Sequence, residues 1–234
     1  LLATIGTSPQ IVTEMLYAIH HENHQWPDDI YLITTKKGEP KAVEGLLEKG
    51  HLQRLCEELN RPIPKFDATH VLVTRGADKT EVEDARSLAD HAALADFITT
   101  QVRERTASPD TTLHASLAGG RKTMTFYIGY AMSLFGRAED TLSHVLISEG
   151  YENIPDFWFP TQAEHYRYVY DKDQKKLDAS AAKVTLAPIP FVRLRDGLPK
   201  ALLAGDANFS QTVDAIQQSL EPPRLHIYRS DDGE

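Results

Sequence analysis

Hydrophobic and polar positions follow two different periods along the first 150 residues. Short apolar segments rich in Leu, Ile, Val and Thr have strand character, and longer segments between them repeat apolar residues every three or four positions. The pattern predicts strands at 1–6, 29–35, 68–74, 111–117 and 143–148, and helices at 10–20, 40–59, 87–105 and 123–136. Because strands separated by helices need crossover connections, we expect an α/β fold with a mostly parallel sheet and helices on both faces. The last helix is apolar nearly all round, which predicts burial against the sheet.

After residue 150 the chain becomes aromatic and extended. Strand-like composition recurs at residues 156–161, 165–171 and 182–194. A polar turn signal at 171–174 predicts a β-hairpin or a small extra sheet, and a short helix is expected at 209–219. We therefore expect a ligand-binding domain at 1–150 and a β-rich extension with a short C-terminal helix at 151–234. The extension is expected to pack on the first domain or on a dimer partner.

The charge balance narrows the choice of partners. The 234 residues include 25 Lys and Arg against 34 Asp and Glu, which gives a formal net charge of −9. This excess of negative charge argues against general binding to DNA or RNA duplexes, because such binding depends on cations that neutralise phosphates. A small phosphorylated ligand remains compatible, since a few local cations, backbone amides and helix N-termini can hold it.

Targeting signals and cysteine content point to the cytoplasm. No apolar run approaches the roughly 18 residues that span a bilayer, which argues against a membrane protein. The opening LLATIG lacks the basic flank and the cleavage site of a signal peptide, so we interpret it as the first strand. Cys56 is the single cysteine and cannot form an internal disulfide. We expect it to be buried in a helix, in a protein of the reducing cytoplasm.

The first candidate loop is Gly6-Thr7-Ser8-Pro9-Gln10, which joins the first predicted strand to the first helix. An open α/β sheet binds ligands at the carboxyl ends of its strands, where this loop is expected. Thr7 or Ser8 can cap the helix, and Pro9 suits its first turn. Both hydroxyls would then lie beside free backbone N–H groups, which is a phosphate-binding arrangement. The alternative is a plain helix cap without a ligand.

The second candidate loop follows the fourth predicted strand and runs into the apolar helix. It contains the candidates Ser116, Ala118, Gly119, Gly120, Arg121, Lys122 and Thr123. The two glycines let the backbone approach a ligand closely, Arg121 offers a planar fork, and Lys122 a point charge. The spacing is not that of a Walker A loop, which needs four residues between its glycines. A tight turn with two solvated cations is the alternative, but charges between a strand and an apolar helix favour an anion site.

Three further residues are weaker candidates for ligand contact. Thr34 and Thr35 end the second predicted strand, where they can touch a base or a ribose, although a Thr pair is also ordinary in a strand. Arg86 can reach the ligand or form an ion pair with Asp84, and the ion pair is the favoured interpretation.

The two main loops are expected to face each other. The first and fourth strands of a doubly wound sheet can flank its switch point, which would bring Ser8 and Lys122 to opposite walls of one crevice. His114 and His144 lie inside predicted strands, so we interpret both as structural residues whose hydrogen bonds are satisfied.

Three segments carry a resemblance to a known family: LLATIGTSPQIVTEMLYAI, HASLAGGRKTMTFYIGYAMSLFG and LSHVLIS. They resemble the CRISPR-associated CARF proteins of the NE0113-type group, over most of residues 1–195. The resemblance implies a Rossmann-like CARF fold and a homodimer. It also implies that the two loops bind cyclic oligoadenylate, the second messenger made by type III CRISPR complexes. Some standalone members are ring nucleases in which a Ser of the first loop and a Lys of the second matter for cleavage, and Ser8 and Lys122 occupy these positions.

Two functions follow from the resemblance. The favoured one is a ring nuclease that cleaves cyclic oligoadenylate, with cyclic tetra-adenylate as the expected ring, and thereby switches off type III CRISPR signalling. Attack by a ribose 2′-OH on its own 3′-phosphate needs neither a metal nor a cofactor, so we expect none. The alternative is a non-catalytic CARF sensor that regulates an effector domain or a partner. The short segment after Gly197 favours the nuclease, because it has no room for an effector domain. An enzyme for a dinucleotide is disfavoured, because the chain lacks a GxGxxG turn.

Overall fold

The computed structural model describes residues 1–152 and 154–220, and the end of the predicted extension, 221–234, lies outside these described residues. Its main sheet has six strands in the order β3-β2-β1-β4-β5-β8. The strands are β1 (Leu2–Thr4), β2 (Tyr31–Thr34), β3 (Val71–Val73), β4 (His114–Ser116), β5 (Thr141–Ile147) and β8 (Val184–Pro188). The first five are parallel, and β8 runs antiparallel to β5. The expected mostly parallel, Rossmann-like sheet is confirmed.

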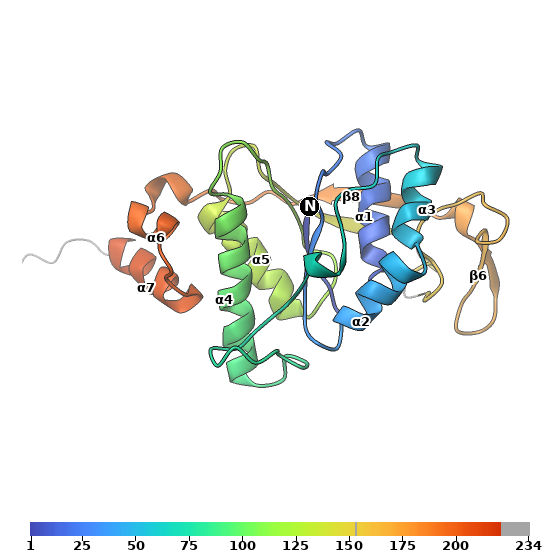
Figure 1. Ribbon diagram of the computed structural model, residues 1–234. Coiled ribbons are helices and arrows are strands. Elements are labelled where there is room, and N and C mark those ends of the chain that lie inside the picture. Colours follow the sequence, from blue (N-terminus) through green and yellow to red (C-terminus); the bar gives the residue numbers. More distant parts are fainter. Residues whose placement is uncertain (153, 221–234) are drawn as a thin grey trace, which may run out of the picture.

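Helices cover both faces of this sheet, as predicted (Figure 1). One face packs on α1 (Gln10–His21) and α3 (His51–Glu58), and the other on α4 (Leu88–Arg105) and α5 (Lys122–Phe135). Successive residues of a strand point to opposite faces, so Leu2 belongs to the second core and Ala3 to the first. Cys56 is buried in α3, as expected, and burial raises the pKa of its thiol to about 11. The predicted burial of α5 against the sheet is confirmed by residues such as Ile128 and Met132, while Phe126 on another side of this helix is 58% exposed.

The single helix predicted at 40–59 is wrong, because the structure has three shorter pieces there. They are α2 (Glu39–Ala42), a π-helical segment Val43–Glu48, and α3. A Cβ on Gly45 would lie 2.3 Å from Cη2 of Trp158, so the wide turn lies against this buried indole. Gly50 then ends the segment with φ +68°, a left-handed conformation that glycine adopts without strain.

The extension contains the predicted hairpin, formed by β6 (Tyr168–Tyr170) and β7 (Lys176–Asp178) with its turn at 171–174. The strand predicted at 156–161 is wrong, because this segment is irregular and buries aromatic side chains, among them Trp158, which stacks on His51 with ring centroids 3.9 Å apart. The segment 182–194 supplies β8 to the main sheet instead of a separate layer.

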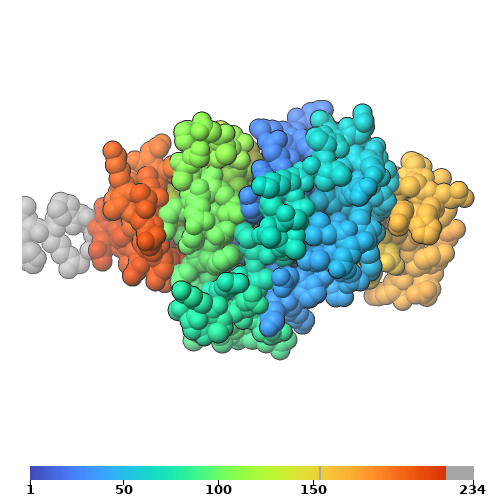
Figure 2. All heavy atoms as spheres, viewed as in Figure 1, coloured from blue at the N-terminus to red at the C-terminus, as the bar shows by residue number. Residues whose placement is uncertain are grey.

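The helices of the extension lie at the other end of the molecule. They are α6 (Lys200–Ala204) and α7 (Phe209–Leu220), and α7 matches the helix expected at 209–219. Figure 2 shows these helices beyond α4 and α5, with the hairpin at the opposite end. None of the helices in the described part of the chain is long and apolar enough to cross a membrane.

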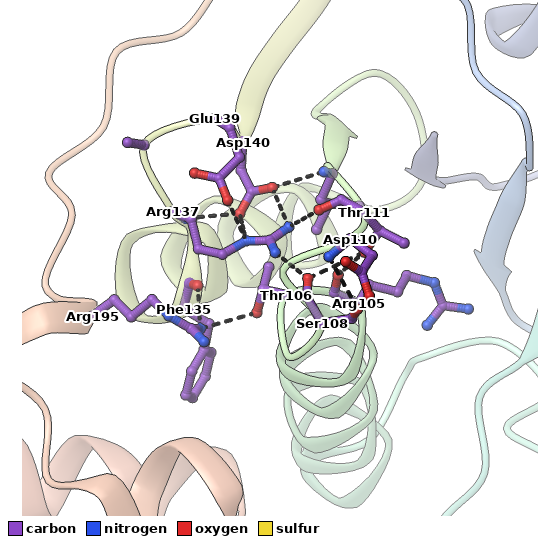
Figure 3. A network of polar contacts seen from close by, with 12 residues as sticks. Arg105, Thr106, Ser108, Asp110, Thr111, Phe135, Arg137, Glu139, Asp140 and Arg195 are labelled. Carbon is purple, nitrogen blue, oxygen red and sulfur yellow. Dashed lines mark hydrogen bonds and ion pairs between the residues drawn. The ribbon is translucent and has the colours of Figure 1, made fainter.

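A polar network lies at the amino edge of the sheet, where β4 and β5 begin (Figure 3). Arg137 donates to both carboxylate oxygens of Asp140 and to the carbonyl oxygens of Ser108 and Thr111. Asp140 is fully buried and also accepts from the backbone N–H of Leu113 at 2.7 Å. This network joins the α4–β4 connection to the α5–β5 turn and so fixes the spacing of the two strands.

Candidate functional site

The loops that follow β1 and β4 meet at the carboxyl edge of the sheet. The two strands are neighbours and lie at its switch point, as the sequence predicts. A Cβ on Gly6 would lie 3.6 Å from Cα of Gly120, so the backbones of the two loops pack directly against each other. The loop after β2 joins them, because a Cβ on Gly38 would lie 2.5 Å from the carbonyl oxygen of Gly6. The predicted crevice is therefore built from backbone in close contact.

The second loop requires its two glycines. Gly119 has φ +94° and Gly120 has φ +76°, a region that other residues rarely adopt. A Cβ on Gly119 would lie 2.3 Å from Cδ1 of Ile11 and 2.9 Å from the carbonyl oxygen of Thr4. The Thr4 hydroxyl donates to the carbonyl oxygen of Gly119 at 3.2 Å and holds the turn in place.

The two helices that leave these loops begin without a side-chain cap. Pro9 is the N-cap residue of α1, so the expectation that Thr7 or Ser8 caps this helix is wrong. Both hydroxyls are exposed instead, because the chain has already turned into the helix at Pro9. Arg121 is the N-cap of α5 and likewise makes no capping hydrogen bond. The first backbone N–H groups of both helices therefore stay available to an anion, and each helix adds the positive end of its dipole.

The cations of the site divide into paired and unpaired groups. Arg121 donates through Nε and Nη2 to Asp84, and Arg86 donates to the same carboxylate at 3.0 Å. These hydrogen bonds lower the pKa of the Asp84 carboxyl to about 2, and the largest contribution comes from Arg121. The predicted Arg86–Asp84 pair is confirmed, and Arg121 is turned toward Asp84. Lys37 of the loop after β2 lies 3.7 Å from the same carboxylate. Lys122 is exposed and forms no ion pair with any residue in the described ranges, so it is open to a ligand.

Other predicted residues lie behind the loops. Thr34 is fully buried and donates to the carbonyl oxygen of Ile5 at 3.0 Å, and Thr35 is 8% exposed. Ser116 is buried, and its hydroxyl accepts from the N–H of Ala118, which is buried as well. These four residues support the crevice from below. The hydroxyl of Thr123 is buried and has no partner among the residues that the structure describes.

A cavity of about 510 Å³ opens beside the two loops, between α1, β5 and the segment that follows β5. It is lined by Thr7, Ser8, Gln10, Ile11, Glu14, Ala118, Gly119, His144, Val145, Leu146, Ile147, Tyr151, Glu152, Ile154 and Pro155. Five of these residues were candidates from the sequence: Thr7, Ser8, Gln10, Ala118 and Gly119. The volume lies in the range of small-molecule sites.

Two titratable residues of this cavity were missed by the sequence analysis. Glu14 is 5% exposed, and burial raises the pKa of its carboxyl to about 8. His144 has a buried Nδ1 without a partner in the described part of the chain, so the prediction that its hydrogen bonds are satisfied is wrong. His114 has the expected partner, since its Nε2 lies 2.6 Å from Oγ of Ser143. A signal for Glu14 existed: it is the only charged residue in the apolar run IVTEMLYAI.

No group of three or more His, Cys, Asp or Glu side chains that could hold a metal ion occurs within 1–152 and 154–220. The donors of the crevice are backbone N–H groups, hydroxyls and Lys122, and such donors suit a phosphate.

The fold is a Rossmann-like α/β fold, and its candidate site is a crevice lined by backbone N–H groups, hydroxyls and Lys122 at the switch point of the sheet. The model of one protein family, described as CRISPR-associated protein NE0113, matches residues 8–222, which is most of the chain. No curated protein matches it. The chain belongs to the CRISPR-associated NE0113 family.

Proposed function

We propose that this protein binds a cyclic oligoadenylate, with tetra-adenylate as the expected ring, and cleaves it. The observation that carries the proposal is the contact of Gly6 with Gly120, which sets the loops of Ser8 and Lys122 side by side at two uncapped helix starts. Backbone N–H groups at helix starts hold phosphates, and Lys122 adds a cation. Membership in a CRISPR-associated family supports this ligand, together with the resemblance to CARF proteins.

The reaction uses a nucleophile that the substrate brings. A ribose 2′-oxygen attacks the phosphorus of its own 3′-phosphate, and the bond from that phosphorus to the 5′-oxygen of the next nucleotide breaks. The 2′-proton passes to solvent, and solvent protonates the leaving 5′-oxygen. The products are a 2′,3′-cyclic phosphate and a 5′-hydroxyl, and the step needs neither a metal nor a cofactor.

The protein contributes position and charge. Lys122 and the first N–H groups of α5 stabilise the negative charge that develops on the phosphate oxygens, and Ser8 orients the 2′-hydroxyl or the phosphate. Ser8 is exposed, and no hydrogen bond joins its hydroxyl to a His or carboxylate side chain in the described part of the chain. Turnover without a strong general base is expected to be slow.

The same observation favours a second candidate, a CARF sensor that binds the ring without cutting it and regulates an effector domain or a partner. A binding site needs the N–H groups and the cation, but it needs no group to activate a nucleophile. The two candidates share the ligand and the loops, and they differ only in whether the ring is opened.

Incubation of the purified protein with cyclic tetra-adenylate or cyclic hexa-adenylate in the presence of EDTA separates these candidates. Ring nuclease activity predicts linear products that end in a 2′,3′-cyclic phosphate, resolved by liquid chromatography and mass spectrometry. Binding without any product would favour the sensor. Loss of cleavage on addition of EDTA would contradict the metal-independent reaction, and absence of both binding and cleavage would contradict the ligand.

A two-fold symmetric homodimer is expected to be the binding unit. A cyclic oligoadenylate with an even number of nucleotides has its own two-fold axis, which an isologous interface can match by presenting each loop twice. Light scattering at micromolar concentration should therefore report a dimer in the presence of the ring. A stable monomer both with and without the ring would contradict this expectation.

A further inference from the structure

The cavity beside Ser8 extends away from the two phosphate-binding loops, along α1. Gln10 is in the first turn of this helix, and Glu14 follows one turn later. Residues four apart share a helix face, so both lie on the side of α1 that lines the cavity, with Glu14 about 6 Å further along the helix axis. A phosphate at the loops would therefore place the attached nucleoside within reach of Gln10 and Glu14.

The side-chain amide of Gln10 has one oriented hydrogen bond, and this bond shows which of its two polar atoms is the nitrogen. Its Nε2 donates to the carbonyl oxygen of Pro155 at 2.7 Å. The reverse orientation would place two oxygens against each other, so Oε1 is the atom that remains. This oxygen is buried and has no partner among residues 1–152 and 154–220.

Glu14 presents a donor and an acceptor side by side. Its carboxyl is 5% exposed, and burial raises its pKa to about 8. Below that pH it is mainly neutral, so that one oxygen donates a proton and the other accepts one. A neutral carboxyl can therefore pair with an edge that offers an acceptor beside a donor, which an ionised carboxylate cannot do.

Beyond the loop hydroxyls, Tyr151 and the exposed Glu152, the rest of the cavity wall is apolar and suits a flat ring. Ile11 of α1 faces Val145 and Ile147 of β5 across it, and Ile154 contributes from the segment after β5. His144 of β5 adds a buried Nδ1 without a partner in the described chain. Apolar walls with a few convergent polar atoms are the usual composition of a site for an aromatic ligand.

We propose that this cavity is a base subsite, in which Gln10 and Glu14 recognise the edge of adenine that carries its amino group. The amino group has two hydrogens, one for Oε1 of Gln10 and one for the carbonyl oxygen of Glu14. The ring nitrogen beside it accepts the proton that Glu14 donates. Hypoxanthine carries an oxygen in place of the amino group, and that oxygen would face the acceptor of Gln10. This inference rests on the proposed function and names the residues that select its ligand.

The test compares cyclic tetra-adenylate with cyclic tetra-inosinate in direct binding titrations of the full chain. The wild type should bind the adenine ring at least tenfold more tightly than the hypoxanthine ring. Glu14→Gln keeps a donor and an acceptor in the same places, so it should stay within about threefold of the wild type for both rings. Glu14→Met keeps the length but removes both groups, and it should lose tenfold or more of the affinity for the adenine ring.

A folding check accompanies both variants, and the possible failures are distinguishable. A thermal unfolding midpoint no lower than that of the wild type would show that Glu14→Met has not lost binding through unfolding. If that variant unfolds, Glu14→Gln still tests the idea, since a large loss of adenine preference in it contradicts the pairing. If the wild type binds both rings equally, or if Glu14→Met binds as the wild type does, the base subsite is wrong and the proposed function stands. If the wild type binds no ring, the proposed function fails and this inference fails with it.

Discussion

Two polar clusters at opposite edges of the central sheet, Arg137 with Asp140 and the residues around the Ser8 cavity, differ in how their buried groups are satisfied. At the amino edge, Arg137 and Asp140 bind each other and the neighbouring backbone (Figure 3). At the carboxyl edge, polar atoms of Gln10, Thr123 and His144 are buried without a partner in the part of the chain that the structure describes. Buried polar groups are normally paired, so an unpaired set around a cavity needs an explanation. The Arg137–Asp140 cluster has the features of a stabilising network, and the unpaired atoms around the cavity fit the binding site proposed above.

The largest expected effect is at the amino edge. Asp140→Ala removes the buried carboxylate that pairs with Arg137, whose side chain is 10% exposed, and leaves it only the half-exposed carboxylate of Glu139 at 3.3 Å. It also leaves the N–H of Leu113 without an acceptor. The free energy of unfolding should fall by about 3–5 kcal/mol, measured by urea denaturation at pH 7. Arg167→Ala is the control, because its ion pair with Asp178 is much more exposed and should matter far less. Equal losses in the two variants would contradict the role of burial at this edge.

The next largest expected effect is a pH dependence of the free energy of unfolding that Glu14, at the carboxyl edge, causes. Burial raises the pKa of Glu14 to about 8 in the folded protein from 4.5, so the folded state holds this proton more tightly than the unfolded state. The stabilising effect is complete below pH 4.5 and is lost as the pH rises through 8.

Glu14→Gln removes this dependence, so the variant should gain stability over the wild type between pH 5 and pH 8. One pKa unit corresponds to about 1.4 kcal/mol, and the expected gain is on the order of a few kcal/mol. Urea denaturation of both proteins across this range measures it, and the difference between them cancels groups that titrate equally in both. A constant difference across the range would show that Glu14 is not buried as a neutral acid.

Lys122→Ala tests the open cation of the carboxyl edge. We expect ring binding to weaken about ten- to hundredfold, and cleavage to fall with it, because a charge-assisted contact to several phosphate oxygens is lost. Gel shift and single-turnover cleavage in EDTA measure the two effects. Lys172→Ala, in the exposed hairpin turn, is the matched control and should behave as the wild type does. Unchanged binding in the Lys122 variant would remove this residue from the site.

Ser8→Ala should have the smallest effect on binding and should separate binding from cleavage. The backbone N–H groups and Lys122 remain, so affinity should fall tenfold or less. Single-turnover cleavage should fall further, because orientation of the attacking group matters only in the transition state. Ser210→Ala, at an exposed position of α7 away from the two loops, is the control and should bind and cleave as the wild type does. Cleavage at the wild-type rate in the Ser8 variant would contradict the positioning role of this residue.

Local patterns were enough to predict the five parallel strands of the sheet and its two central loops, but not that 182–194 adds an antiparallel strand to it. The strand and helix periods are properties of the backbone, so Leu2–Thr4 and Gln10–His21 followed from the order of apolar residues. The pair Gly119-Gly120 signalled a turn that only glycine can make, and both residues have positive φ. The prediction of a single helix at 40–59 was wrong because the apolar periodicity continues across Gly50, although the backbone there adopts the left-handed conformation and interrupts the helix.

The amino-acid sequence by itself determined the α/β class, the order of the elements and the position of both loops at strand ends, because each depends on neighbouring residues. The pair of Arg86 with Asp84, two residues apart, could be predicted locally, but only the tertiary structure decided the pairing of polar groups that are distant in the chain. Arg121 meets Asp84, 37 residues away in the chain, and so turns toward it, while Lys122 beside it stays open. The neutral carboxyl of Glu14 was equally out of reach of local patterns, because its pKa is set by apolar walls brought from β5 and from the segment that follows it. Burial and charge pairing depend on contacts between segments that are distant in the chain, and these contacts form only when the chain folds.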